Sequence, residues 1–387
     1  MTEKRKSPAL RFRGYTDDWE QRKLGDVVQI TMGQSPDGST YSDEPSDYIL
    51  VQGNADLQNG WVCPRIWTTQ ITKKADAGDL IMSVRAPAGA MGKTAYNAVI
   101  GRGVAAIKGN EFIYQLLVKM DTDGFWKTLS CGSTFESLNS DNIKNAEVKI
   151  PTTAEQIKIG GFFQYLDNLI TLHQRKLEKL KLVKKSMLEK MFPKNGSSVP
   201  EIRFKGFTDD WEQRKFNDIA TRESAVRKSS PDCPSIEYED VVAEAGILNK
   251  DIRLKDSEKN GIIFDGSQVL YGKLRPYLHN WHNPDFEGVA VGDWWVLKPI
   301  HVDKSFLYRL IQTQKFDDIA NQSSGSKMPR ADWNLVSNSE FSIPPLIDEQ
   351  VRIGTYFNDL DNLITLHQRK VEKLKILKKS MLEKMFV

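Results

Sequence analysis

Apolar residues recur at intervals of three and four along two long stretches of the chain, residues 155–192 and 349–386. This spacing places them on one side of an α-helix and is typical of coiled coils. Pro151 and Pro193 bracket the first stretch, which predicts a single helix about 57 Å long. We call each apolar stripe a seam. The seam positions are Ile159, Phe163, Leu166, Ile170, Leu177 and Leu180, then Ile353, Phe357, Leu360, Ile364 and Leu374.

A lone helix of this length would leave its seam in water, whereas two such helices can bury their seams against each other. We therefore predict a coiled coil, which is antiparallel if a rotation relates the two halves and which places the variable regions at opposite ends of a rod. His173 and His367 fall in the seams and are interpreted as polar residues that fix the register, with ligand or switch roles as the alternative. The helix lysines, Lys184 among them, indicate either a solvated face or a phosphate-binding surface.

Outside the helices the pattern changes to short β-rich runs among clusters of Gly, Pro, Asn and Asp, which predicts mixed strands, helices and turns. The clearest runs are Tyr48–Val51, Asp79–Val84, Val269–Tyr271 and Trp294–Leu297. Polar, glycine-bearing stretches are predicted to lie on loops at 32–36, 85–94, 271–277 and 323–333.

The chain is a tandem repeat of two halves. Residues 8–23 and 200–215 share 12 of 16 positions, and the two helical stretches share 29 of 38. The regions between them have diverged almost completely, although a faint common register survives. Neutral drift alone would change the sequences of the helical segments and of the regions between the constant segments to a similar extent. We therefore infer that the constant parts bind something common and the variable parts bind something different.

These features predict an α+β fold. It consists of two globular mixed α/β domains in a tandem pseudo-twofold repeat, separated by two long helices packed as an antiparallel coiled coil. The predicted boundaries are 1–150 for the first domain, 151–194 for the central helix and spacer, 195–344 for the second domain and 345–387 for the C-terminal helix.

Composition and charge exclude several classes of protein. Of the 387 residues, 40% are hydrophobic and 27% charged, which is ordinary for a folded protein, and no stretch is apolar enough to cross a membrane. Three scattered cysteines predict a reducing, cytoplasmic setting. The net charge of +3 is zero over 1–154, +4 over 155–192, −4 over 193–348 and +3 over 349–386. A uniformly basic nucleic-acid coat is therefore excluded, but local basic patches are not.

No catalytic or metal-binding motif is complete. The stretch 89–94 imitates a phosphate-binding loop but has Pro87 where the pattern requires glycine. His279 and His282 have no further His or Cys ligand nearby. Serine-hydrolase, nuclease and amino-methyltransferase signatures were also sought and are missing. The chain is therefore predicted to be non-catalytic on its own, with neither a cofactor nor a metal.

The loops combine arginine and lysine with glutamine, serine and aromatic residues. Such side chains make contacts with base edges and phosphates, although ordinary surface loops share this composition. The candidate DNA-contacting residues are Gln34, Ser35, Arg85 and Lys93 in the first domain, and Lys273, Arg275, Tyr277, Lys327, Arg330 and Trp333 in the second.

Taken together, several motifs resemble the specificity subunit of type I DNA restriction–modification systems. They are RFRGYTDDWEQRKLGD at Arg11–Asp26 with its copy from Arg203, GQSP at 33–36, YGKLRPY at 271–277, KMPRADW at 327–333, and the paired helices EQ…LDNLITLHQRK…KKSMLEKMF. The resemblance extends over essentially the whole chain. The motifs are weak one by one and specific as a set.

The resemblance implies two target-recognition domains, each reading one half of a split, asymmetric sequence in double-stranded DNA. It implies helices that dock two modification (methyltransferase) subunits, and two restriction subunits in the full complex. S-adenosylmethionine, ATP and Mg²⁺ would then belong to those partners. No membrane is involved.

The first domain departs from the family pattern, because Thr134 and Ser137 stand where Lys327 and Arg330 stand in the second. A contact argued for one domain therefore does not transfer to the other. Two alternatives stay open at this point. One is a two-headed coiled-coil adaptor between proteins that does not read DNA, and the other is a nuclease or methyltransferase with unfamiliar motifs.

Overall fold

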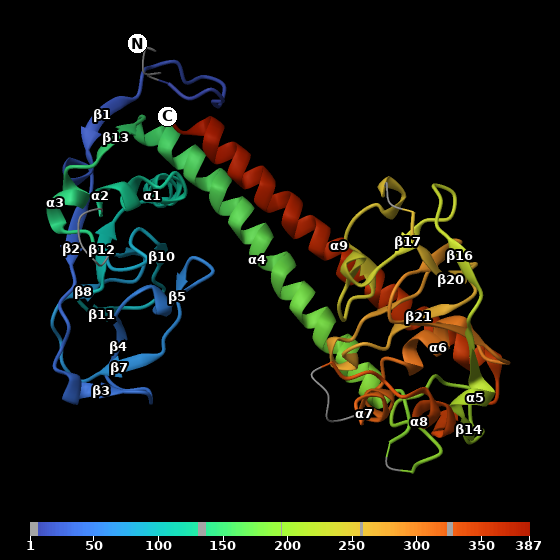
Figure 1. Ribbon diagram of the computed structural model, residues 1–387. Helices are drawn as coiled ribbons and strands as arrows, with labels where there is room; N and C mark the ends of the chain where they lie inside the picture. Colours follow the sequence, from blue (N-terminus) through green and yellow to red (C-terminus); the bar gives the residue numbers. More distant parts are fainter. Residues whose placement is uncertain (1–6, 131–136, 195, 256–257, 323–327) are drawn as a thin grey trace. The chain divides into compact units, whose positions relative to one another are not determined.

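The computed structural model describes residues 7–130, 137–194, 196–255, 258–322 and 328–387 (Figure 1). The chain forms two compact units. Unit 1 comprises residues 1–174 and 369–387, and unit 2 comprises residues 175–368. No helix in the described part of the chain is long and apolar enough to cross a membrane.

Two long helices, α4 (Thr153–Lys190) and α9 (Ile347–Met385), confirm the helices predicted from the apolar spacing. Each compact unit contains part of both helices. Unit 1 holds the first half of α4 and the end of α9, and unit 2 holds the end of α4 and the first half of α9.

Unit 1 has three sheets and three short helices among its described residues. The sheets are β1 (Glu20–Lys23) with β13 (Glu147–Ile150); β2 (Gln29–Met32), β12 (Val104–Lys108), β9 (Leu80–Ser83), β10 (Met91–Lys93), β6 (Trp61–Val62) and β5 (Leu57–Gln58); and β3 (Tyr41–Ser42), β7 (Ile66–Thr68), β4 (Tyr48–Val51), β11 (Ala98–Ile100) and β8 (Lys74–Ala75). The helices are α1 (Glu111–Thr122), α2 (Phe125–Leu129) and α3 (Ser140–Lys144).

Unit 2 has a similar arrangement, but its sheets have different numbers of strands. Its sheets are β14 (Glu212–Lys215) with β25 (Glu340–Ile343); β15 (Ala220–Glu223), β24 (Trp294–Pro299), β21 (Val269–Gly272) and β22 (Trp281–His282); β16 (Val226–Lys228), β20 (Asn260–Phe264), β23 (Gly288–Ala290) and β17 (Ser235–Ile236); and β18 (Val241–Val242) with β19 (Ile247–Leu248). The helices are α5 (Phe216–Ile219), α6 (Lys304–Leu310), α7 (Gln314–Ala320) and α8 (Trp333–Asn338).

The four β-rich runs predicted from the sequence correspond to β4, β9, β21 and β24 and are confirmed. The prediction that the whole stretch 85–94 is a loop is wrong, because β10 occupies Met91–Lys93. This short strand pairs antiparallel with β9, with Met91 opposite Met82 and Gly92 opposite Ile81. Three residues with a glycine at the centre carry no strand signal of their own, so only the pairing partner makes them a strand.

A phenylalanine just beyond the end of each long helix helps to fill the core of one unit. In unit 1, Phe386 stacks on Phe112 of α1, with 5.1 Å between ring centroids, and contacts Phe163 at 5.7 Å. In unit 2 the equivalent Phe192 stacks on Phe306 of α6 at 5.6 Å. The constancy of the MLEKMF ending thus has a structural cause, because each copy fills the same aromatic core.

Within each unit the two helical segments pack antiparallel along their seams, as predicted. Ile159, Phe163 and Leu166 are buried in the core of unit 1 together with Leu382 and Met385 of α9. In unit 2 the buried seam residues are Ile353, Phe357 and Leu360, against which Leu180 packs partly buried. Of the remaining seam positions, Ile170 and Ile364 are buried, and Leu177 and Leu374 are half-buried.

One ion pair in each unit joins the two helices. Lys378 Nζ lies 2.6 Å from Asp167 Oδ1 in unit 1, and Lys184 Nζ lies 2.7 Å from Asp361 Oδ1 in unit 2. Lys184 is only 13% exposed, and its burial lowers its pKa. Neither the solvated nor the phosphate-binding interpretation therefore holds for Lys184 and Lys378, because both are held between helices.

The constant segments near residues 11 and 203 are anchored to the long helices by buried carboxylates. Arg11 makes two hydrogen bonds of 2.7 Å to Glu155, and Arg203 binds Glu349 at 2.6 and 2.8 Å. The Glu155 and Glu349 side chains are 0% and 1% exposed. A bidentate arginine is a good partner for a carboxylate that has lost its water.

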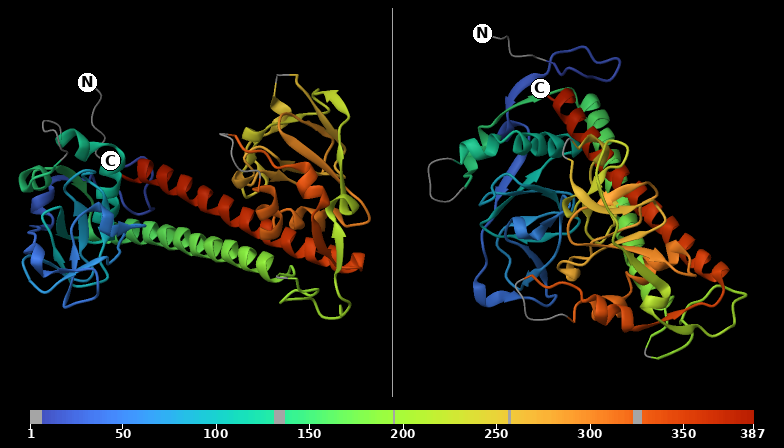
Figure 2. Two further views of the ribbon diagram at one scale, coloured as in Figure 1. Left: turned by 60° about the horizontal axis from the view of Figure 1, so that its bottom comes forward. Right: turned by 45° about the vertical axis from the view of Figure 1, so that its right-hand side comes forward.

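Two adjacent glycines on α4 give a test of how closely this helix docks. In Figures 1 and 2, α1 lies beside the first turns of α4. A Cβ on Gly160 would lie 2.8 Å from the backbone nitrogen of Phe112, whereas a Cβ on Gly161 would meet nothing within 4 Å. We expect Gly160→Ala to destabilise the protein by about 1–3 kcal/mol, because backbone must move. Urea unfolding of the full chain measures this change.

The matched control is Gly161→Ala. It is expected to stabilise the helix by about 0.5–1 kcal/mol, because alanine loses less backbone entropy than glycine. The equivalent position of α9 already carries Thr355, whereas Gly354 is kept against Ser305. Equal effects of the two alanines on stability would contradict the close packing of α4 on α1.

Candidate nucleic-acid interface

Three segments of unit 2 meet beside the end of β21. The backbone nitrogen of Lys273 donates to the carbonyl oxygen of Asp293 at 2.9 Å, and that of Ala331 donates to the carbonyl oxygen of Lys273 at 2.8 Å. Leu274 also forms an isolated β-bridge with Arg330. The loop after β21, the turn before β24 and the segment before α8 are thereby tied together.

Unit 1 contains the same backbone arrangement. Val84 donates to the carbonyl oxygen of Gly103 at 2.9 Å, and Leu138 donates to that of Val84 at 2.9 Å. Arg85 forms the matching β-bridge with Ser137. We call these three joined segments the loop frame of each unit.

The side chains on the two loop frames differ in charge at five equivalent positions, whereas at the sixth Leu138 and Ala331 are both uncharged. The pairs, first unit 1 and then unit 2, are Val84 and Lys273, Arg85 and Leu274, Ala86 and Arg275, Gly103 and Asp293, and Ser137 and Arg330. One backbone geometry therefore carries two unrelated sets of polar groups. Such a design suits two domains that recognise different ligands in the same manner.

Asp293 is the electrostatic centre of the frame in unit 2. Its carboxylate accepts two hydrogen bonds from Arg330, at 3.2 and 3.1 Å, and lies 3.6 Å from Lys273 Nζ. The hydrogen bonds from Arg330 lower the pKa of Asp293, and the same contact raises the pKa of Arg330. Arg330 is nevertheless 54% exposed, so its pairing orients the guanidinium at the surface.

Tyr238 makes two hydrogen bonds to the backbone of this loop frame. Its hydroxyl donates to the carbonyl oxygen of Asp293 at 2.8 Å and accepts from the backbone nitrogen of Leu274 at 2.9 Å. Burial raises its pKa, so the hydroxyl stays protonated and keeps both bonds at neutral pH. Neither Tyr238 nor Asp293 was predicted from the sequence, because Arg330 and Asp293 are 37 residues apart and no local pattern links them.

Arg275 occupies a strained position in the same frame. Its backbone is left-handed, with φ 49°, and its backbone nitrogen donates to the carbonyl oxygen of Pro329 at 2.7 Å. The Nε atom is buried and has no hydrogen-bond partner. Its neighbour Tyr277 is 52% exposed.

The remaining predicted residues of unit 2 are placed differently. Trp333 is half-buried and packs edge-on against Phe216 and Trp295, at 6.0 and 5.2 Å, with the Arg222 guanidinium 4.4 Å above its ring. Trp333 therefore packs against the core of unit 2, independently of any role in binding DNA. Lys327 lies outside the described residues.

In unit 1, three of the four predicted residues flank one turn. Gln34 donates through its backbone nitrogen to Ile100, and the Ser35 hydroxyl accepts from the backbone nitrogen of Arg102 at 3.2 Å. Arg85 is exposed on the other side of the same turn, where Val84 bonds Gly103. Gln34 is also exposed.

Lys93 lies apart from that turn. It projects from β10 with its Nζ 2.9 Å from Glu111 and 4.9 Å from the centre of the Trp61 ring. Its side chain is only 12% exposed. The structure therefore groups Gln34, Ser35 and Arg85 and gives Lys93 a partner inside unit 1. A role for any of them in contacting DNA stays a prediction.

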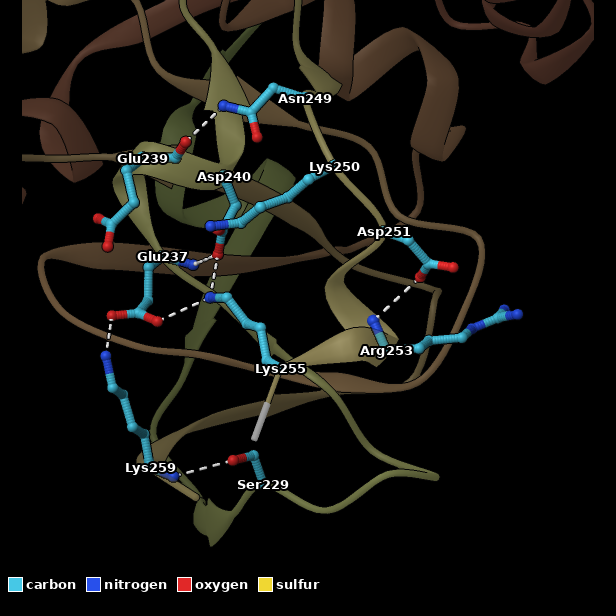
Figure 3. A network of polar contacts seen from close by, with 10 residues as sticks. All are labelled: Ser229, Glu237, Glu239, Asp240, Asn249, Lys250, Asp251, Arg253, Lys255 and Lys259. Carbon is cyan, nitrogen blue, oxygen red and sulfur yellow. Dashed lines mark hydrogen bonds and ion pairs between the residues drawn. The ribbon is translucent and has the colours of Figure 1, made fainter. Parts of the chain in front are cut away.

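A group of lysines in unit 2 is paired internally (Figure 3). Lys255 and Lys259 both contact Glu237, and Lys250 Nζ lies 2.8 Å from Asp240, which is fully buried. Burial by itself would raise the pKa of Asp240. The contacts with Lys250 and Lys255 have the larger, opposite effect, so the pKa lies below its ordinary value. This network pairs three lysines of unit 2 with two carboxylates.

The long helices expose apolar side chains at repeated positions. In unit 1 these are Ile157, Leu172 and Ile376, and in unit 2 their equivalents are Val351, Leu366 and Leu182, all between 42% and 68% exposed. Two of the three pairs differ in residue but have both kept an apolar one. We call each trio the apolar helix set of its unit.

Comparison with known proteins places this architecture in a family. A family model described as the type I restriction modification DNA specificity domain matches residues 16–182 and 208–375. A putative type I restriction enzyme MjaX specificity subunit of Methanocaldococcus jannaschii is 29% identical over 182 residues, which cover 44% of this chain and 42% of that protein. The MjaIX specificity subunit of the same organism is 23% identical over 417 residues, covering 95% of this chain and 92% of that protein.

A solved structure supports the fold independently. The crystal structure of a type I restriction–modification S subunit from M. genitalium is similar with a TM-score of 0.68 at 13% identity, covering 98% of this chain and 99% of that one. The two segments matched by the family model span most of the chain. The protein therefore belongs to the type I restriction modification DNA specificity family, and it carries two such domains in tandem.

Proposed function

We propose that this chain is the non-catalytic specificity subunit of a type I restriction–modification complex and that each unit reads one half of a bipartite, asymmetric DNA target. The observation that supports this best is the pair of loop frames, which share their backbone hydrogen bonds and differ in charge at five of six equivalent positions. Base-edge readout needs fixed donors and acceptors, and changing only those side chains changes the sequence that is read.

The helices would serve as the docking surface for two modification (methyltransferase) subunits. The two apolar helix sets support this part, because each unit presents apolar residues at the same three positions. Single exposed apolar residues are normal on a protein surface, but the presence of apolar residues at the same exposed positions in both units favours a surface that a partner covers. Equivalent surfaces would bind two copies of the same partner.

The reaction chemistry would belong to those partners. S-adenosylmethionine would be bound by the modification subunits, and ATP and Mg²⁺ by two restriction subunits in the full cytoplasmic complex. This chain would place the complex at its target sequence on the DNA. Its large regions are neutral or acidic, so phosphate neutralisation would come mainly from the partners.

An exchange of one domain tests the proposal. Residues 20–150 are replaced by the equivalent segment of a relative, so that β1 and β13 move together and keep their pairing. The complex is expressed with its methyltransferase subunits, and methylated sites are mapped by sequencing. We expect one half of the target to change completely while the other half and its methylation stay the same.

Two results would contradict the two-domain reading. If both half-sites changed, the units would not read DNA independently. If methylation continued at the original sites, the variable domains would not determine the target, and the adaptor interpretation would be favoured.

A further inference from the structure

Helix α6 attaches the globular part of unit 2, meaning the part outside α4 and α9, to α9. At the start of α6, the backbone nitrogen of Asp303 donates to Gln350 Oε1 at 2.8 Å. A Cβ on Gly354 would collide with Ser305, so the two helices are in close contact there. The contact at the other end of α6 is of a different kind, because it is made by the charged side chain of Arg309, which is 1% exposed.

Arg309 makes two directed contacts with α9. Its two terminal nitrogens donate to Asp361 Oδ2 at 2.7 Å and to Asn358 Oδ1 at 2.6 Å. These acceptors are three residues apart and therefore lie on the same face of α9. The guanidinium also lies over the rings of Tyr308 and Phe357, at 4.6 and 5.7 Å from their centres. A planar group held by two hydrogen bonds and two rings is fixed in one orientation.

This arrangement is not the one that stabilises unit 2 most. Asp361 also pairs with Lys184 of α4, so two cations share one carboxylate. Burial lowers the pKa of Lys184, and of the two nearby charges Asp361 raises it and Arg309 lowers it. Buried ion pairs contribute little stability compared with well-packed apolar residues. The presence of Arg309 is therefore better explained by the geometry that it fixes.

Unit 1 has a neutral residue at the equivalent place. The side-chain nitrogen of Gln115 in α1 donates to Asp167 Oδ2 of α4 at 2.8 Å. Asp167 also pairs with Lys378, so both units have the carboxylate and the lysine, and only the third partner differs. A glutamine thus fits beside the same carboxylate, and this attachment forms in unit 1 without an arginine.

We propose that Arg309 is a positioning residue that fixes the orientation of the globular part of unit 2 on its helices and thereby limits the spacing between half-sites that the chain accepts. The proposal rests on the function proposed above. One additional base pair moves a half-site by about 3.4 Å along the DNA axis and by about 35° around it. Groups that recognise a ligand need to be held within about 0.5 Å of the productive geometry, so a rigidly attached domain does not follow that displacement.

Arg309 acts through the loop frame of unit 2 and not by touching DNA. Its side chain is buried, and both terminal nitrogens are bonded within the unit. The start of α6 is held by the contacts of Asp303 and Ser305, so the contact of Arg309 at its end fixes the direction of the helix. Loss of that second contact lets the globular part turn about the first.

The test uses the full chain in complex with its methyltransferase subunits. Methylation rates are measured on duplexes with the native spacing between half-sites and on duplexes with one base pair more or fewer. The spacing discrimination is the rate on the native spacing divided by the rate on an altered one. Arg309→Gln copies unit 1 and is expected to fold, which urea unfolding checks. We expect it to lower the spacing discrimination by about 10-fold or more, because small displacements of a positioned group change rates strongly.

The control is Arg227→Gln, which removes an exposed arginine of the same unit that is paired with Glu287. It is expected to leave the spacing discrimination unchanged. Should Arg309→Gln fail to fold, Arg309→Lys replaces it, because lysine keeps the buried charge but not the planar fork. This variant is expected to lower the discrimination in the same direction.

A purely structural role of Arg309 would lower all the rates by the same factor and leave the spacing discrimination unchanged. That result would overturn the proposal, as would a wild type that methylates every spacing equally well. If the exchange of residues 20–150 changes one half-site while Arg309→Gln leaves the discrimination unchanged, the function proposed above stands and only the role of Arg309 fails.

Discussion

Replacing Leu166 by aspartate is expected to unfold unit 1 or to leave it marginally stable. Leu166 is 3% exposed and lies in the core that Phe163 and the end of α9 share. A carboxylate placed among these apolar side chains loses its water, which costs on the order of 3–5 kcal/mol. Urea unfolding, followed by near-ultraviolet circular dichroism, measures the loss. Wild-type stability in this variant would refute the seam.

The matched control is the same substitution six residues further along the helix. Leu172 is 59% exposed, so Leu172→Asp is expected to change the unfolding free energy by no more than about 0.5 kcal/mol. If the helices dock methyltransferase subunits as proposed, the variant is expected to weaken that binding about 10-fold or more, because a charge would enter an apolar contact. Normal co-purification of those subunits with Leu172→Asp would remove this residue from the docking surface.

The second large effect concerns the buried carboxylate of the network in Figure 3. Asp240→Asn is expected to destabilise unit 2 by about 3 kcal/mol at neutral pH, because Lys250 and Lys255 lose the charge that holds them. Urea unfolding near pH 7 measures the difference. The control Asp232→Asn changes an exposed aspartate of the same unit and is expected to leave stability nearly unchanged.

The pH dependence of this difference follows from the direction of the shift. The pKa of Asp240 lies below its ordinary value of 3.8. Its stabilisation is therefore complete above that value and is lost as the pH falls through the lower pKa of the folded state. The gap between the wild type and Asp240→Asn is expected to be full near pH 7 and to narrow below about pH 4. A gap that stayed constant down to about pH 3 would contradict the pairing of Asp240 with the lysines.

The sequence predicted individual residues of the candidate interface but not how they are arranged. Residue type and loop composition selected Lys273, Arg275 and Arg330, and the structure joins their backbones in one loop frame. The same reasoning selected Lys93, which the fold directs toward Glu111 inside unit 1. Composition cannot tell these cases apart, because the partner of each cation comes from a distant part of the chain.

The sequence by itself determined the repeat, the two long helices and the side of each helix that is buried. The helices and their buried sides follow from periodicity, which is a property of neighbouring residues. The repeat follows from comparing the two halves of the sequence, and neither needs knowledge of a distant contact. Only the tertiary structure decided that Lys184 and Lys378 lie between helices, that Phe192 and Phe386 help to fill the unit cores, and that Asp293 orients Arg330. Each of these depends on residues brought together across long separations in the chain, where burial and pairing change the behaviour of a charge that looks exposed in the sequence.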